Sequence, residues 1–283
     1  MKMQRTKFAA KEIGIGEFST MNCFCADHDK ILFAPVEDAP LTFSSEQLAL
    51  LHYRAIAAEF YQRRNQQESA ASELDWESGE SQSSRFSWIF RWSGKAFEEA
   101  RDALTRIEKL IAARRFFDLG SLVVRFDAPP SLMAAGAFRP QYDFAARCVQ
   151  NLADACCYVA MHLLADEGAA VLAFTWLQSD SAAERFVRTF AALPKDQMAS
   201  LAVQCAFEHI EHTCMSDSWW SNLKRPMQAG LVDRVRRTNS LAYRRSPRCL
   251  SYRMHYADWP VADVRLSQPL HEVDGGEVRI VER

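Results

Sequence analysis

The pattern of apolar and polar positions predicts two amphipathic helices in the first part of the chain. After Ser44 or Ser45, either of which can cap a helix, apolar residues recur at helical spacing as far as Arg64. A more regular stripe follows from Ser93 to Phe117, and the charged residues on its other faces are typical of a solvated surface. Residues 1–43 are punctuated by glycine and proline, so this segment is expected to be irregular.

The pattern breaks between these two helices. Residues 65–84 are acidic, rich in serine and nearly without apolar side chains, which predicts a loop or a disordered insertion. Residues 85–92 alternate aromatic and polar side chains, so a strand and the first turns of the next helix both fit them. We therefore expect an irregular N-terminal segment, 1–43, and one helix-rich domain, 44–283, with an insertion at 65–84.

The middle of the chain changes to the periodicity of a sheet. Residues 119–126 form an apolar run that ends near two prolines, as a strand does. Two further apolar runs, 155–164 and 169–177, flank an Asp-Glu-Gly sequence typical of a hairpin turn. Three antiparallel strands are the expected product, although a buried helix over 148–164 fits the same residues. The predicted fold class is α+β, helix-rich, with a small central antiparallel sheet.

The last third of the chain returns to helical spacing. Helices are predicted over residues 181–193, 196–214 and 219–237, and a proline stops the first of them. The segment after Ser246 contains enough aromatic and apolar residues to pack against the rest of the chain.

Composition narrows the class of protein. The chain of 283 residues is 48% hydrophobic, and its 34 lysines and arginines against 36 acidic residues give a net charge of -2. This balance provides no overall attraction for nucleic acid or an anionic membrane. No apolar run approaches the roughly 20 residues that span a bilayer, and no signal peptide is evident. Eight cysteines are too few for a disulfide scaffold, so we expect a cytoplasmic protein with reduced thiols.

One candidate metal site lies near the N-terminus. Cys25 and His28 are spaced as one half of a tetrahedral zinc site, with Cys23 and Asp29 beside them. A second pair of ligands would have to come from elsewhere in the chain. The alternative is a buried cysteine beside a histidine that caps a helix.

A second cluster lies within the helix predicted over residues 196–214. Neighbours three or four positions apart share a helical face, but the first cysteine and the second histidine are roughly 10 Å apart along the axis. One ion would therefore not be held by all of them, and the alternative is an amphipathic helix with a histidine-rich polar side. The members are Cys205, His209, His212 and Cys214, with Glu208 and Glu211 between them.

Two tryptophans, Trp219 and Trp220, follow Ser216-Asp217-Ser218. Either Asp217 or Ser218 is expected to cap the next helix, and the indoles would join its start to the core. A ligand platform is the alternative role of this pair.

The region after these tryptophans is locally basic, although the whole chain is not. Such a density of cations can neutralise phosphates, which makes the cluster a candidate nucleic-acid-binding surface. The alternative is a solvated helix end that pairs with the acidic segment at 65–84. The cluster consists of Arg234, Arg236, Arg237, Arg244, Arg245 and Arg248, with Lys224 and Arg225 upstream.

No phosphate-binding loop, dinucleotide fingerprint or nucleophile elbow occurs, so the N-terminal phrase is the most distinctive motif. It resembles a family of uncharacterised bacterial proteins, and the likeness extends over most of the chain. The N-terminal phrase consists of GIGEFST at 14–20, FCADHD at 24–29, LFAPVE at 32–37 and Glu46-Gln47. The later matches are FRPQYDF at 138–144, FTW at 174–176, Phe207-Glu208 and Trp219-Trp220.

The resemblance implies a zinc-held element similar to that of HNH nucleases, in which Cys25 and His28 are the second ligand pair. The first pair and a catalytic histidine would precede Cys23, but residues 1–22 contain neither histidine nor cysteine. The expectation is therefore a degenerate or truncated HNH-like nuclease, or a nucleic-acid-associated bacterial protein, in defence against phage or mobile DNA. Glu208 matches the family and is a further candidate site residue. The alternative is a non-enzymatic module that binds a protein partner.

Overall fold

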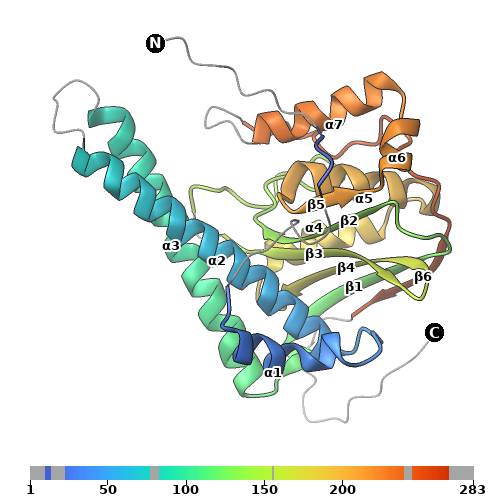
Figure 1. Cartoon of the computed structure of the whole chain (residues 1–283), viewed down its shortest axis with the longest axis horizontal. Coiled ribbons are helices and arrows are strands. Elements are labelled where there is room, and N and C mark those ends of the chain that lie inside the picture. The colour runs from blue at the N-terminus through green and yellow to red at the C-terminus, as the bar shows by residue number, and fades with distance from the viewer. Residues whose placement is uncertain (1–9, 14–22, 77–82, 155, 239–243, 268–283) are drawn as a thin grey trace.

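The computed structural model describes residues 10–13, 23–76, 83–154, 156–238 and 244–267, with the backbone alone at 70–76 and 83–90. Its centre is one antiparallel sheet with helices on both faces (Figure 1). Helices α2 and α3 form a long antiparallel pair over one face, while α4 and α5 cover the other. Helix α7 packs on the outer side of α5 and forms a further layer. The elements of the sheet are β1 Leu119–Phe126, β2 Leu132–Phe138, β3 Val159–Asp166, β4 Ala169–Leu177, β5 Thr213–Met215 and β6 Val261–Leu266.

The fold class predicted from the sequence is confirmed: a helix-rich α+β fold with a central antiparallel sheet. The sheet has six strands among the described residues, in the order β5-β2-β3-β4-β1-β6. The three expected strands correspond to β1, β3 and β4, and the hairpin turn between β3 and β4 lies where it was predicted. The buried helix over 148–164 is therefore wrong. Strand β2, which has the sequence LMAAGAF, gave no signal because alanine and glycine have little preference for strands.

The helices begin largely where the sequence predicts. At the start of α2, the Gln47 backbone N–H donates to Ser44 Oγ (3.3 Å) and the Ser44 N–H donates to Gln47 Oε1 (3.4 Å). This reciprocal pair is a capping box, which confirms Ser44 as the cap. The helices are α1 Ala26–Glu37, α2 Ser45–Trp76, α3 Ser83–Ala112, α4 Ser181–Ala191, α5 Lys195–His209, α6 Asp217–Asn222 and α7 Arg225–Thr238, with a short 3-10 helix, η2, Phe116–Asp118.

Several expected irregular segments are helical instead. Residues 26–37 form α1 rather than irregular chain, and Gln47 secures its connection to α2 by donating to the Pro35 and Pro40 carbonyls. Most of the predicted insertion, 65–84, also belongs to helices, because α2 continues to Trp76 and α3 begins at Ser83. Its glutamine, glutamate and alanine residues are good helix formers, so a polar stretch can extend a helix that is already nucleated. Residues 14–22 and 77–82 lie outside the described residues.

Two predicted helices are shorter than expected. The helix predicted over 196–214 ends at His209, and an extended segment leads from it into β5. The helix predicted over 219–237 is divided into α6 and α7 at Leu223-Lys224. No helix in the part of the chain described here is long and apolar enough to cross a bilayer.

The two faces of the sheet are packed differently. The face under α2 and α3 is rich in alanine, which lets the long helices approach the strands closely. The face under α4 and α5 is filled by phenylalanine rings in edge-on contacts, such as Phe174 with Phe190 at 5.2 Å between centroids. The sheet therefore separates a core of small side chains from a core of large ones.

Gly120 in β1 is required by the ring that covers it. Gly120 pairs with Trp176 across the sheet, and an added Cβ would lie 2.2 Å from the Trp176 ring. Because Trp176 is buried, it has no room to move away. Glycine in a strand often marks such a close approach of another group.

We predict that Gly120→Ala lowers the free energy of unfolding by about 2 kcal/mol, through overpacking against Trp176. Gly94→Ala in α3 is the matched control, because the nearest atoms there belong to the flexible Gln67 side chain at 3.4 Å. This control should be stabilised by roughly 0.5–1 kcal/mol. Urea denaturation measures both, and an equal change in the two variants would contradict the packing argument.

Two histidines lie in the alanine-rich layer, fully enclosed. His52 on α2 places its Nδ1 atom 2.9 Å from Thr175 Oγ1 on β4. Burial, and after it the charge of nearby His162, lowers the pKa of His52 from 6.5 to about 3. Burial also lowers the pKa of His162 to about 4, with the Arg54 charge as the second cause. Both imidazoles are therefore neutral in the folded protein at neutral pH.

These two histidines should make stability fall as the pH drops below about 6.5. Between that pH and about 4, the unfolded chain binds the two protons that the folded chain excludes. Each proton adds up to about 1.4 kcal/mol per pH unit to the slope of the free energy of unfolding against pH. Chemical denaturation at several values from pH 7 to pH 5 measures this slope, and His162→Gln should make it shallower. The same slope in this variant would contradict the assignment.

Candidate functional site

The locally basic region forms a separate layer of the structure. Helices α6 and α7 and the chain that follows them, residues 244–258, lie over α5 on the side away from the α2–α3 pair (Figure 1). We call residues 244–258 the return segment. Residues 217–258 contain nine lysines and arginines and three aspartates. The layer therefore carries a net charge of +6 in a chain whose total is -2.

A buried carboxylate attaches this layer to the body of the protein. Glu208, near the end of α5, has a side chain that is 1% exposed. Arg234 of α7 donates from Nη1 to Glu208 Oε2 at 3.0 Å, and Arg245 of the return segment forms an ion pair with Oε1 at 3.5 Å. Arg234 also donates to Gln204 Oε1 (2.8 Å) and to the Cys249 carbonyl (2.5 Å). The Glu208 side chain thus joins α5 to both α7 and the return segment.

The candidate nucleic-acid-binding arginines fall into two groups. Arg234 and Arg245 point inward to Glu208 and are largely buried. Arg236, Arg237 and Arg244 are exposed. Because α7 turns by about 100° per residue, positions 234 and 236 lie on opposite sides of the helix. The sequence therefore located the basic cluster but did not separate its structural members from those that face solvent.

The exposed cations exceed the acidic groups near them. Arg236 and Arg237 share one carboxylate, Asp233, and the hydrogen bond from Arg236 is the main cause that lowers the pKa of Asp233. Within the described ranges, no acidic side chain lies within ion-pair distance of five other cations. These five are Lys224, Arg225, Arg244, Arg248 and Arg253. The described parts of the acidic segment, 65–76 and 83–84, belong to α2 and α3, whose arm lies away from α7 (Figure 1).

The tryptophan pair joins α6 to the return segment. Ser216, rather than Asp217 or Ser218, caps α6 by accepting from the Trp219 backbone N–H at 3.3 Å. The Trp219 indole Nε1 donates to the Tyr256 carbonyl at 3.1 Å, and the two indole centroids are 6.4 Å apart. Trp219 and Trp220 are both partly exposed, so packing does not use all of their surface.

The histidines of the second predicted cluster do not share a helical face. His209 ends α5, where both of its ring nitrogens are buried and the ring stacks on Phe138 with 4.2 Å between centroids. Burial, followed by the charges of Arg245 and Arg234, lowers the pKa of His209 well below its usual value. His212 lies beyond the helix, with its Nε2 atom 3.0 Å from Gln62 Nε2. The expected histidine-rich polar side is therefore wrong: His209 belongs to the core and His212 contacts α2.

The Cys25–His28 pair lies at the start of α1, away from α7 (Figure 1). Cys25 Sγ is 3.0 Å from His28 Nδ1, and both side chains are exposed, so the alternative of a buried cysteine is wrong. A closed zinc site requires four ligands. The described residues contain no group of three or more histidine, cysteine, aspartate or glutamate side chains that could hold a metal. The pair alone does not fit a closed site, and zinc binding stays a prediction.

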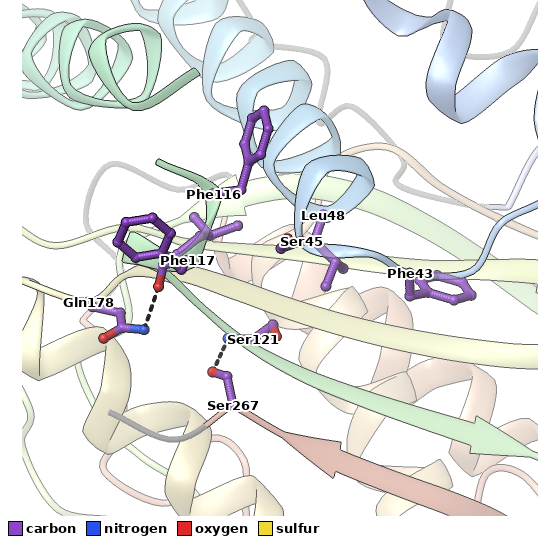
Figure 2. Close-up of a pocket in the computed structure, with 9 residues that line it drawn as sticks. Phe43, Ser45, Leu48, Phe116, Phe117, Ser121, Gln178 and Ser267 are labelled. Atoms are coloured by element: carbon purple, nitrogen blue, oxygen red, sulfur yellow. Dashed lines mark hydrogen bonds between the residues drawn. The ribbon is translucent and has the colours of Figure 1, made fainter. Parts of the chain in front are cut away.

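A cavity of about 280 Å³ opens beside the start of α2 (Figure 2). Its polar groups largely bind one another: the Gln178 amide donates to the Phe117 carbonyl at 2.9 Å, and the Ser121 N–H donates to Ser267 Oγ at 2.7 Å. None of the described residues that line it is charged. The lining consists of Phe43, Ser45, Leu48, Phe116, Phe117, Leu119, Ser121, Gln178 and Ser267.

A larger cavity, of about 410 Å³, lies within the basic layer. It is bounded by the α6–α7 junction, by the return segment and its continuation to Trp259, and by the loop that follows β1. His255 lies at this cavity, with Nε2 2.5 Å from Asp258 Oδ1 and Nδ1 3.1 Å from the Tyr252 hydroxyl. These residues were not among the site residues predicted from the sequence. The alternation of aromatic, basic and polar side chains from Tyr252 to Trp259 was the available signal.

Comparisons with protein-family models, with curated proteins and with solved structures found no match. The residues themselves therefore carry the functional argument.

We predict that Glu208→Ala lowers the free energy of unfolding by about 3–5 kcal/mol, because two arginines would lose their buried counter-charge. Asp233→Ala is the matched control: it also removes a carboxylate with two arginine partners, but at the surface. Its cost should be below about 1 kcal/mol. Urea denaturation of both variants tests the difference. Similar losses of unfolding free energy in the two variants would contradict the argument that burial makes the Glu208 ion pairs more important than those of Asp233.

Proposed function

We propose that this chain is a nucleic-acid-binding protein and that the outer layer of α7 and the return segment is its binding surface. The observation that carries the proposal is the sorting of charge within this layer. Glu208 holds two arginines in the interior, and seven other cations of the layer are exposed. Among the described residues, the ion pairs of these seven are those of Arg236 and Arg237 with one carboxylate, Asp233. A surface with excess positive charge attracts the phosphate backbone and releases its counterions on binding.

The distribution of charge over the whole chain supports the same surface. Since the chain totals -2 and the layer carries +6, the remaining residues carry -8. Charge is therefore unevenly distributed along the chain, and the positive layer is the part that attracts a polyanion. The small net charge of the whole chain, -2, therefore does not indicate that one layer is strongly positive.

Exposed apolar side chains lie among these cations. Tyr252 and Met254, on either side of Arg253, are 39% and 38% exposed. Proteins that bind nucleic acid through both phosphates and bases combine cations with rings in this way. The proposal does not depend on the resemblance to HNH-like proteins, and a nuclease activity and a role in defence stay predictions.

We predict that Arg236→Ala combined with Arg237→Ala weakens nucleic-acid binding by a similar factor for all sequences. The slope of log affinity against log salt concentration should become shallower by about 1–2, because one or two phosphate contacts are lost. Fluorescence anisotropy with a labelled oligonucleotide at several salt concentrations measures both quantities. Asp233→Ala should strengthen binding, since it frees the two arginines from their shared carboxylate.

Arg101→Ala combined with Lys109→Ala is the matched control, because it removes two exposed cations from α3. Its affinity and salt slope should equal those of the unmodified protein. If the unmodified protein binds neither single strands nor duplexes at low salt, the proposal is wrong and the non-enzymatic protein-interaction alternative is favoured.

A further inference from the structure

We propose that the 410 Å³ cavity in the basic layer receives an unstacked nucleobase, so that the ligand of this surface is single-stranded nucleic acid. This inference rests on the proposed function and specifies its substrate class. Three features support it: the rings that line the cavity, the charge at its mouth and the cations next to the segments that line it.

Two indole rings of the cavity are held in place by contacts with the rest of the protein, and one of them, Trp219, keeps an exposed surface. The Trp219 indole N–H donates to the Tyr256 carbonyl. This hydrogen bond fixes the ring while part of it stays exposed. Trp259 lines the cavity from the core side: it is 6% exposed and packs edge-on against Phe126 at 5.7 Å. A base that stacks on a fixed ring gains about 1–3 kcal/mol, and the ring loses little freedom. The volume is within the usual range for a ligand site, roughly 300–1,000 Å³.

The polar groups at the cavity suit the edge of a base and not a phosphate. Asp258 is 92% exposed at the mouth, and its carboxylate would repel a phosphate group. The same carboxylate can accept hydrogen bonds from the amino groups of cytosine, adenine or guanine. Asn222 also lines the cavity and offers a donor and an acceptor from one amide. A neutral, planar ligand with amino and carbonyl groups on its edge fits this set.

Cations adjoin two of the segments that line the cavity. Lys224 and Arg225 directly follow Leu223, and Arg253 lies two residues before His255. A strand whose base enters the cavity would therefore place its neighbouring phosphates near these side chains. In a duplex the bases are stacked and paired, and removing one from the stack costs a few kcal/mol. The arrangement therefore favours a strand whose bases are already free.

The test measures the affinity of the full-length chain for three probes of equal length: a 15-nucleotide DNA single strand, its duplex, and an abasic strand with the same number of phosphates as the single strand. At one salt concentration, the single strand should bind at least about tenfold more tightly than the abasic strand, which is the gain from stacking one base. It should also bind more tightly than the duplex.

Substitutions at two positions, Trp219 and Asn222, test whether this preference belongs to the cavity. Trp219→Ala should reduce the ratio between intact and abasic strands to about twofold or less, while Trp219→Phe, which keeps a ring, should preserve most of it. Because Trp219→Ala also removes a packed side chain, Asn222→Trp serves as a second variant that fills the cavity from an exposed position. Circular dichroism verifies that each variant is folded.

The possible results separate this inference from the proposed function. Equal affinity for intact and abasic strands, with a normal salt slope, would overturn the base-binding cavity and leave the basic surface in place. Tighter binding of the duplex would also overturn it. Absence of binding to all three probes would overturn the cavity and the proposed function together.

Discussion

The buried carboxylate of Glu208 is the interaction on which the outer layer depends. Removing a carboxylate from water is costly unless cations and hydrogen bonds replace the solvent, and Arg234 and Arg245 supply them from two different parts of the chain. A purely apolar contact could hold α7 against α5, but it would not require these two arginines to turn inward. The return segment has a second anchor, because the Tyr256 N–H donates to buried Ser200 Oγ at 2.8 Å. Together these contacts fix the position of the layer on α5.

The same constraint defines the surface. Glu208 holds Arg234 and Arg245 inside the protein, so the other cations of the layer lie at its exterior. Two of these, Arg236 and Arg237, share Asp233, and the others have no acidic partner among the described residues. The anchors also determine the cavity, since the carbonyl that accepts from Trp219 belongs to Tyr256, the residue held by Ser200. The cationic surface and the aromatic cavity are thus two results of one attachment between α5 and the return segment.

The sequence predicted the parts of this structure that depend on local pattern. Ser44 was one of the two caps expected for α2, and β1, β3 and β4 were found, because capping and apolar runs are encoded by nearby residues. Strand β2 was missed because its alanines become a strand only when β3 and β5 pair with it. The inward position of Arg234 could have been predicted from the sequence, since Arg234 lies three residues after buried Leu231 on the same face of α7. Its partner Glu208 was not, because no local rule connects residues 26 positions apart.

Burial also determines how the two groups of arginines respond to salt. Screening acts strongly on charges exposed to solvent, with a Debye length of about 8 Å at physiological ionic strength, and weakly on charges enclosed by protein. Arg234 and Glu208 are enclosed, with side chains 17% and 1% exposed, whereas Arg236 and Arg237 are 65% and 54% exposed. Salt that weakens attraction between the exposed cations and a polyanion therefore leaves the attachment of the layer largely unchanged. The protein can release such a ligand without loosening the structure that presents the surface.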